Sequence, residues 1–209
     1  MAYTYITNIR HLISENPTAE VPRQVLKERD FLGAIIKAST AGDEVEFLTG
    51  LPCRRRINRK ACTGTILVRR QDLPKRFIFW HCSNCEDGGR ISEFAGTWYD
   101  LSKWRPQVPG EPDEEIVEVT ISREEYKALI SPNVHSYDPD SEKIMFSAKS
   151  TTKGIAMRAL EGDMDNFIGF VAADGNHEPN RKRAKLMDSI YWKIQVALDE
   201  VMERKGEGL

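Results

Sequence analysis

Long hydrophobic runs are missing from this chain of 209 residues. No stretch approaches the roughly 20 apolar residues that a membrane-spanning helix requires, and the mean hydropathy is −0.49. The first ten residues lack the basic and apolar regions of a secretory signal. We therefore expect a cytoplasmic protein that has no membrane partner.

The common catalytic signatures are also missing. The sequence contains no G-x-S-x-G nucleophile elbow, no Walker phosphate loop, no H-E-x-x-H helix and no G-x-G-x-x-G after a strand. These absences remove the common enzyme classes and favour a binding protein. No internal repeat occurs either, which excludes a solenoid.

The net charge is small, but the charged residues are unevenly distributed. The net charge is −2, yet residues 53–105 carry 12 basic and 5 acidic side chains, whereas residues 106–209 carry 13 and 20. Local fields act over about a Debye length, so the basic middle and the acidic C-terminal half behave as different surfaces.

The hydrophobic pattern predicts an α+β fold. In the N-terminal half we expect helices over Thr4–Ser14 and Arg23–Ser39, then strands over 44–48, 65–70, 77–81 and 90–94, with Gly88 and Gly89 as a break. In the C-terminal half we expect strands over 116–121, near 143–147 and over 155–160, a helix capped by Ser122 and Glu125, one capped by Asp163, and a last helix over Asn180–Arg204.

Proline and acidic residues cluster in 105–115, which is typical of a linker. The predicted organisation is therefore N-terminal helices with a zinc-ribbon-like β module in 1–104, the linker in 105–115, and an α+β unit in 116–205 that ends in the long helix. We expect the apolar face of that helix to form the core of the C-terminal unit. Its residues include Met187, Ile190, Ile194 and Val201.

The four cysteines carry the strongest chemical signal. Their spacing is Cys53-x8-Cys62 followed, after nineteen residues, by Cys82-x2-Cys85. Two cysteine pairs at this separation are typical of a structural zinc site with four thiolate ligands. Disulfides, a redox-active pair at residues 82 and 85, or four buried free thiols are the alternatives, and His81 could replace one ligand.

The residues around the cysteines resemble a known family. The stretches CRRRINRKACTGTI and WHCSNCEDGGRISEFAGTWYDLS are similar to the core of an uncharacterised family of small bacterial proteins with a zinc-ribbon-like segment. The resemblance extends to HLISEN, DFLGAII and GFVAADGNHEPNRKR. It implies no established activity or partner. Glu86 stands where a rubredoxin-type knuckle has glycine, which departs from the ideal knuckle pattern.

A run of basic residues surrounds the first cysteine pair and the strands that follow it. Such a patch suits the phosphate backbone of nucleic acid. The predicted nucleic-acid-binding residues are Arg54, Arg55, Arg56, Arg59, Lys60, Arg69, Arg70, Lys75 and Arg76. The alternatives are a solvated loop, or docking to an acidic protein partner or to the acidic half of the chain itself.

Two further groups have both structural and functional interpretations. Phe94, Trp98, Tyr99 and Trp104 could stack on unpaired bases or fill the core. His177 and Glu178 could form an acid–base or metal-binding pair, or simply lie where one helix ends and the next begins. In the second interpretation, Arg181, Lys182 and Arg183 form the exposed start of the last helix.

We therefore expect a non-enzymatic zinc-ribbon protein that presents a basic surface to nucleic acid. A protein-interaction module with structural zinc and an acidic partner is the alternative. An enzyme that uses His177 and Glu178 is a third hypothesis.

Overall fold

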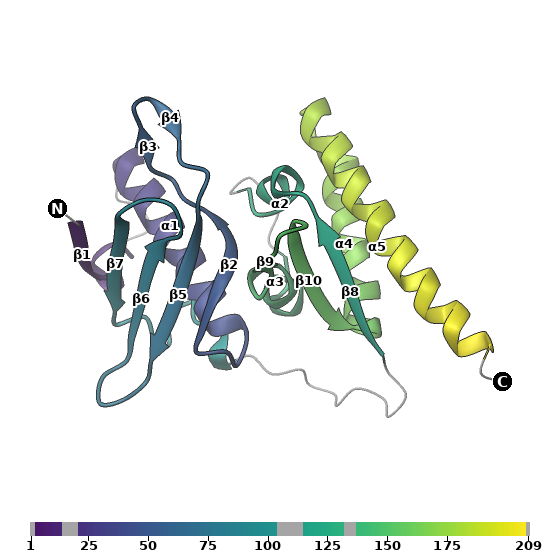
Figure 1. Ribbon diagram of the computed structural model, residues 1–209, viewed down its shortest axis with the longest axis horizontal. Coiled ribbons are helices and arrows are strands. Elements are labelled where there is room, and N and C mark those ends of the chain that lie inside the picture. The colour runs from purple at the N-terminus through teal and green to yellow at the C-terminus, as the bar shows by residue number, and fades with distance from the viewer. Residues whose placement is uncertain (1–2, 14–20, 104–114, 132–136, 208–209) are drawn as a thin grey trace. The chain divides into compact units, whose positions relative to one another are not determined.

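The computed structural model describes residues 3–13, 21–103, 115–131 and 137–207. The chain divides into two compact units, residues 1–103 and residues 104–209 (Figure 1). Both contain helices and strands, which confirms the α+β class. The predicted linker falls outside the described residues, except for residue 115.

The first unit contains a helix packed on a sheet. Its elements are β1 (Tyr3–Asn8), η1 (Ile9–His11), α1 (Arg23–Ala41), β2 (Glu46–Pro52), β3 (Arg56–Ile57), β4 (Lys60–Ala61), β5 (Thr65–Gln71), β6 (Phe77–Cys82), β7 (Asp87–Ser92) and η2 (Leu101–Lys103). Within this unit the strand order is β1-β7-β6-β5-β2. Strand β1 is parallel to β7, and the other neighbours are antiparallel. Strands β3 and β4 form a separate small hairpin.

Helix α1 covers one face of this sheet. Its apolar stripe packs against β2, β5 and β6, and Leu32, Ile35 and Ile36 are at most 1% exposed. Ile66 and Ile78 supply equally buried residues from β5 and β6. The core therefore holds β5 and β6 rigidly in register, and β6 ends at the second cysteine pair.

The helix predicted over Thr4–Ser14 is wrong. Residues Tyr3–Asn8 form β1, and only Ile9–His11 turn helically, with the Asn8 side chain accepting a hydrogen bond from the backbone of Arg10. Tyr, Thr and Ile are strong strand formers, and the long-range pairing with β7 lets them use that preference.

The fourth predicted strand begins earlier than expected, because the two glycines belong to it. Gly88 and Gly89 lie opposite His81 and Trp80 in the pairing of β6 with β7. A Cβ atom on Gly88 would lie 3.0 Å from the carbonyl oxygen of Trp80. The glycine therefore permits a close strand approach instead of breaking the strand.

The second unit is a three-stranded sheet with helices. Its elements are β8 (Ile116–Ile121), α2 (Arg123–Leu129), α3 (Pro139–Phe146), β9 (Lys149–Ser150), β10 (Ile155–Leu160), α4 (Glu161–His177) and α5 (Arg181–Glu207). Strand β10 lies between β9 and β8 and is antiparallel to both. Helix α5 packs on α4, β8 and α2.

The apolar face predicted for the last helix is buried in this unit. Met187, Ile190 and Ile194 are 0% exposed, and Val201 is 2% exposed. Val117, Val119 and Ile121 of β8 are buried too, as expected for a strand with alternating burial. The long helix is thus a core element of its own unit.

The predicted capping box of α2 is confirmed. The Ser122 hydroxyl accepts from the Glu125 backbone N–H at 3.1 Å, and the Glu125 carboxylate accepts from the Ser122 N–H at 2.6 Å. Ser189 and Lys193 of α5 also donate to Glu125, at 2.6 and 2.7 Å. Burial alone would raise the pKa of Glu125, but these hydrogen bonds lower it to about 2. The carboxylate therefore joins α2 to α5.

Two other predictions in this unit are wrong. The region 143–147, predicted as a strand, belongs mainly to α3, because Asp138 accepts from the backbone N–H groups of Asp140 and Ser141 and so caps a helix. Helix α4 begins at Glu161, directly after β10, so Asp163 lies inside its first turn and is not its cap.

Candidate metal centre

The four cysteines meet at one end of the first unit's sheet. Cys53 follows β2, Cys62 follows β4, Cys82 is the last residue of β6, and Cys85 lies in the turn to β7. The strand register aligns them, since the Cys53 N–H donates to the Gly64 carbonyl at 2.9 Å, near the start of β5. Because β3 and β4 lie between Cys53 and Cys62, the β3–β4 hairpin begins and ends beside the same cluster.

The sulfur geometry fits a tetrahedral metal site. All four Sγ atoms lie within 4.8 Å of one another, and the Cys53–Cys85 and Cys62–Cys82 pairs are both 3.7 Å apart. Four ligands at the usual zinc–sulfur distance of about 2.3 Å form a tetrahedron whose edges are about 3.8 Å. Disulfide sulfurs lie about 2.05 Å apart, so the arrangement is not that of two disulfides.

Backbone amides point at the sulfurs in a repeated pattern. The N–H groups two residues beyond Cys53, Cys62 and Cys82 lie 3.4, 3.4 and 3.3 Å from the respective sulfurs, and the Asp87 N–H donates in the same way to Cys85. Such donors stabilise thiolate over thiol. Glu86 does not have a positive φ, so the missing knuckle glycine does not prevent this pattern.

The burial of the sulfurs bears on whether the cluster can hold a cation. Cys53, Cys62 and Cys82 are buried, and Cys85 is partly exposed. Burial raises the pKa values of the Cys53 and Cys85 thiols, whereas the Gly64 N–H lowers that of Cys62. Thiolates that are crowded and desolvated need a positive charge at their centre. An ion bound by all four thiolates would have no open coordination position.

His81 does not belong to the cluster. It precedes Cys82 on β6, and its side chain lies on the exposed side of the strand while Cys82 is buried. The alternation of side chains along a strand accounts for this difference. The cluster of potential metal ligands found among the described residues consists of the four cysteines alone.

Sequence reasoning missed Gly64 and Asn84, which support the cluster. A Cβ atom on Gly64 would collide with Cys82 Sγ and would lie 2.8 Å from the Asn84 Cβ. The Asn84 side chain donates to the Thr63 hydroxyl at 3.2 Å, which links the two cysteine loops. The position of Gly64 two residues after Cys62 was the available signal in the sequence, but only the packing shows why glycine is needed.

We expect Gly64→Ala to weaken metal retention, because the new methyl group would push Cys82 away from its position. The metal content after dialysis against a competing chelator should fall at least about threefold relative to the wild type. Gly42→Ala is the matched control, since a Cβ atom on Gly42 meets nothing within 4 Å. Equal metal retention in the two variants would contradict the packing argument.

The nine predicted basic residues lie in two separate groups. Arg54, Arg55, Arg56, Arg59 and Lys60 lie on or beside the β3–β4 hairpin, at the cysteine end of the sheet. Arg69, Arg70, Lys75 and Arg76 lie at the end of β5 and in the turn to β6, at the opposite end. Seven residues of extended strand span about 20 Å, so the two groups do not form one patch.

The group at the far end is largely occupied by local contacts. Arg70 donates to the Ser39 carbonyl at 2.8 Å and pairs with Asp72 at 3.2 Å. Arg76 also pairs with Asp72, at 3.4 Å, and Arg69 lies 5.2 Å from the ring centre of Phe79.

The hairpin group is the freer one. Arg54 is engaged by Glu28 and lies over the ring of Phe31. For the other four, Arg55, Arg56, Arg59 and Lys60, no ion pair or side-chain hydrogen bond occurs within the described part of the chain. Asn58 and Arg59 have φ values of 50° and 67° and form the tight turn at the hairpin tip. These four cations, three of them on exposed residues, therefore lie beside the cysteine cluster.

The aromatic residues after the second cysteine pair are mainly core residues. Phe94 is 1% exposed, and Tyr99 is 9% exposed and packs so closely on α1 that a Cβ on Gly33 would collide with its ring. Trp98 is 61% exposed. Trp104 lies outside the described residues. Core filling is thus the better interpretation for Phe94 and Tyr99.

The polar break between α4 and α5 is a helix junction. Asn180 caps α5: its side chain accepts from the Lys182 N–H at 3.0 Å. Glu178 accepts from Arg183, which lowers the pKa of Glu178. Its carboxylate is therefore engaged in an ion pair, and among the described residues no hydrogen bond joins it to His177 as an acid–base partner.

Arg183 is the exception among the three predicted exposed cations. Its side chain is 12% exposed and donates to Asp174 at 2.6 Å, to Glu178, and to the Ala128 carbonyl at 3.0 Å. Lys182 is exposed and pairs with Glu124 at 2.9 Å. Cations at this helix start thus face acidic groups, which offsets their unfavourable place near the helix dipole.

Comparisons with protein families, with curated proteins and with solved structures find no match for this chain. A search of the described helices for one long and apolar enough to span a bilayer also finds none.

Proposed function

We propose that the protein is a non-enzymatic zinc protein that binds nucleic acid through its β3–β4 hairpin. The observation that carries the proposal is the position of Arg55, Arg56, Arg59 and Lys60 between two ligands of the metal cluster. A metal that fixes both ends of the hairpin would hold four cations in one arrangement.

Zinc is the metal that the donor set favours. Soft thiolates in a tetrahedral S₄ arrangement select zinc or iron, and the 3.7 Å sulfur separations suit either ion. Zinc is the common structural ion in sites closed by four cysteines. The four cysteines would hold it, and the ion would supply folding free energy rather than chemistry.

Phosphate groups are the ligands that suit the hairpin. Arginine presents a planar fork of donors that matches phosphate oxygens, and cations without protein partners pay no cost of breaking ion pairs. The hairpin offers charge and position without a helix that reads base edges. We therefore propose binding that depends strongly on salt and weakly on sequence.

Charge reversal in the hairpin provides the test. For Arg56→Glu/Arg59→Glu we expect at least about a tenfold loss of affinity for a fluorescent single- or double-stranded oligonucleotide at low salt. The slope of log K against log salt should fall by about 2, because two phosphate contacts are lost. Fluorescence anisotropy at several salt concentrations measures both, and the metal content should remain that of the wild type.

The matched control changes the net charge equally at another place. Lys27 and Lys103 are exposed and lie outside the hairpin, so Lys27→Glu/Lys103→Glu should retain most of the affinity. Equal losses in the two double variants would show a general charge effect and not a site. If neither DNA nor RNA binds at low salt, the proposal is wrong, and an acidic protein becomes the partner to seek for the hairpin.

A further inference from the structure

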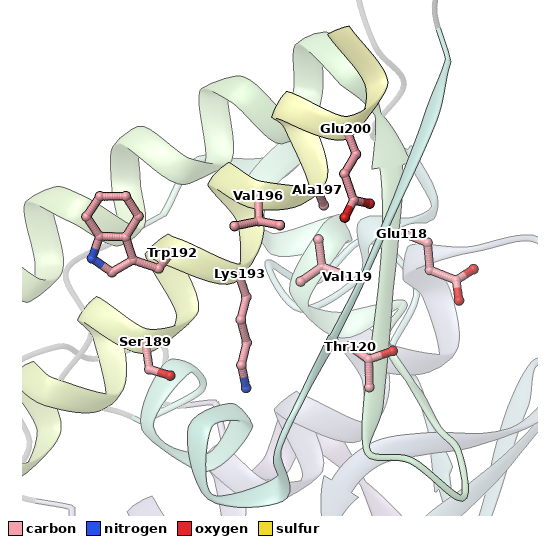
Figure 2. Close-up of a pocket in the computed structure, with 9 residues that line it drawn as sticks. All are labelled: Glu118, Val119, Thr120, Ser189, Trp192, Lys193, Val196, Ala197 and Glu200. Atoms are coloured by element: carbon pink, nitrogen blue, oxygen red, sulfur yellow. The ribbon is translucent and has the colours of Figure 1, made fainter. Parts of the chain in front are cut away.

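A groove lies between β8 and α5 in the second unit. Its volume is about 540 Å³. Figure 2 shows that one wall comes from the strand and the other from the helix. The lining residues are Glu118, Val119 and Thr120 of β8, and Ser189, Trp192, Lys193, Val196, Ala197 and Glu200 of α5.

The strand wall is a sheet edge. In the described residues β8 pairs only with β10, so its other edge has backbone N–H and C=O groups without strand partners. The sequence IVEVTI is rich in strand-forming residues and contains no proline. Such an edge is complementary to another extended chain, which can complete its hydrogen bonds.

The helix wall offers apolar side chains beside that edge. Trp192 is 64% exposed and Val196 is 52% exposed, although both lie on a helix whose opposite face fills the core. Two exposed apolar side chains beside an unpaired strand edge form a patch of the kind that binds other chains. The two residues lie on consecutive turns, so they can receive neighbouring outward side chains of an extended ligand.

The charge of the lining selects the ligand. Lys193 is already paired with Glu125 at 2.7 Å, and Glu118 makes only a surface pair with Arg158 at 3.1 Å. Glu200 makes no side-chain ion pair within the described residues. The lining therefore has an acidic surplus. A second copy of the chain would bring like charges together, whereas a basic peptide would neutralise them.

We infer that this groove binds an extended basic peptide, which adds as a strand to the free edge of β8. Alternate apolar side chains of the peptide lie against Trp192 and Val196, and its lysine or arginine residues face Glu118 and Glu200. The site is on the second unit and does not depend on the function proposed for the hairpin.

Two fluorescein-labelled octapeptides test the inference on the full chain. One alternates valine and lysine, and the other alternates valine and glutamate. We expect the first to bind at least about tenfold more tightly by fluorescence anisotropy, because only it is complementary in charge. Hydrogen exchange of the β8 amides should slow when the lysine peptide is bound, since the edge groups gain partners.

Variants of the helix wall locate the site. Trp192→Ala and Val196→Ser should each lower the affinity for the lysine peptide by at least about fivefold, because apolar contact is lost. Met202→Ala is the matched control: Met202 is 54% exposed on the same helix but does not line the groove. The affinity of the Met202→Ala variant for the lysine peptide should stay within about twofold of that of the wild type.

Backbone recognition is tested with N-methylated peptides. In an extended peptide, every second backbone amide points toward β8. Methylation of these amides in the lysine peptide should abolish binding, whereas methylation of the other amides, which point away from β8, should not. Equal binding of the lysine and glutamate peptides, or unchanged β8 exchange, would overturn the inference. So would a dimer in sedimentation that Trp192→Ala dissociates, because the groove would then hold a second copy.

Discussion

Replacing Cys82 by serine is expected to remove the metal and to unfold the cysteine end of the first unit. Wild-type protein should contain about one zinc per chain, and the variant close to none. Cys82 is buried at the end of β6, and its Sγ atom lies 3.7 Å from the Sγ atom of Cys62. Its loss removes a ligand and also the connection between the two cysteine loops.

The order of unfolding is part of the same expectation. Chelation of the wild-type protein should expose the amides of residues 51–95 before those of the second unit, because the two units have separate cores. Hydrogen exchange with mass spectrometry measures this order, and elemental analysis measures the metal.

The control removes one charge without removing a ligand. Arg56→Ala should keep its zinc and its exchange protection, because Arg56 is exposed and lies between the cysteines without contacting a sulfur. Protein that is free of metal yet keeps full protection of residues 51–95 would show that the cluster is only a set of packed thiols. Iron in place of zinc would change the ion but not the structural role.

The cysteine site could be predicted from the sequence because its determinants are local. The spacing of Cys82 and Cys85 places two ligands in one turn. Because four thiolates commonly bind a tetrahedral metal ion, the second cysteine pair was expected to complete the site. The α+β class and the buried face of α5 were also predictable, since their periodicity of 3.6 and 2 residues is a local pattern. The capping box at Ser122 and Glu125 follows the same logic.

What failed depends on distant partners or on chain geometry. Tyr3–Asn8 became a strand because β7, more than eighty residues away, supplies its neighbour. Arg69 and Arg70 are close in sequence to the hairpin cations, but β5 carries them to the opposite end of the sheet. The groove between β8 and α5 has no local signature, because its walls lie some seventy residues apart in the chain.

Arg183→Met is expected to destabilise the second unit by about 3–5 kcal/mol. The Asp174 and Glu178 side chains, which are 8% and 10% exposed, would lose their shared cation. Tyr137, which donates to Asp174 at 3.2 Å, cannot replace it, because a hydroxyl carries no charge. Hydrogen exchange of the α4 and α5 amides reports this loss separately from the first unit.

Two measurements distinguish an ion-pair effect of Arg183 from a loss of packing. One is the pH dependence of the stability loss in Arg183→Met, and the other is the stability of the control variant Arg181→Met. Arg183 holds the pKa of Glu178 below its ordinary value of 4.5, so the stability contributed by this pair is present above that pH and is lost as the pH falls through the lowered pKa. In Arg183→Met the Glu178 carboxylate protonates more easily, and the difference from the wild type should shrink as the pH falls below the ordinary value of 4.5. Arg181→Met, two residues away on the exposed side of α5, should change stability by less than about 0.5 kcal/mol. Similar losses for both substitutions, or a difference that does not vary with pH, would show that Arg183 stabilises the junction through its packing and not through its charge.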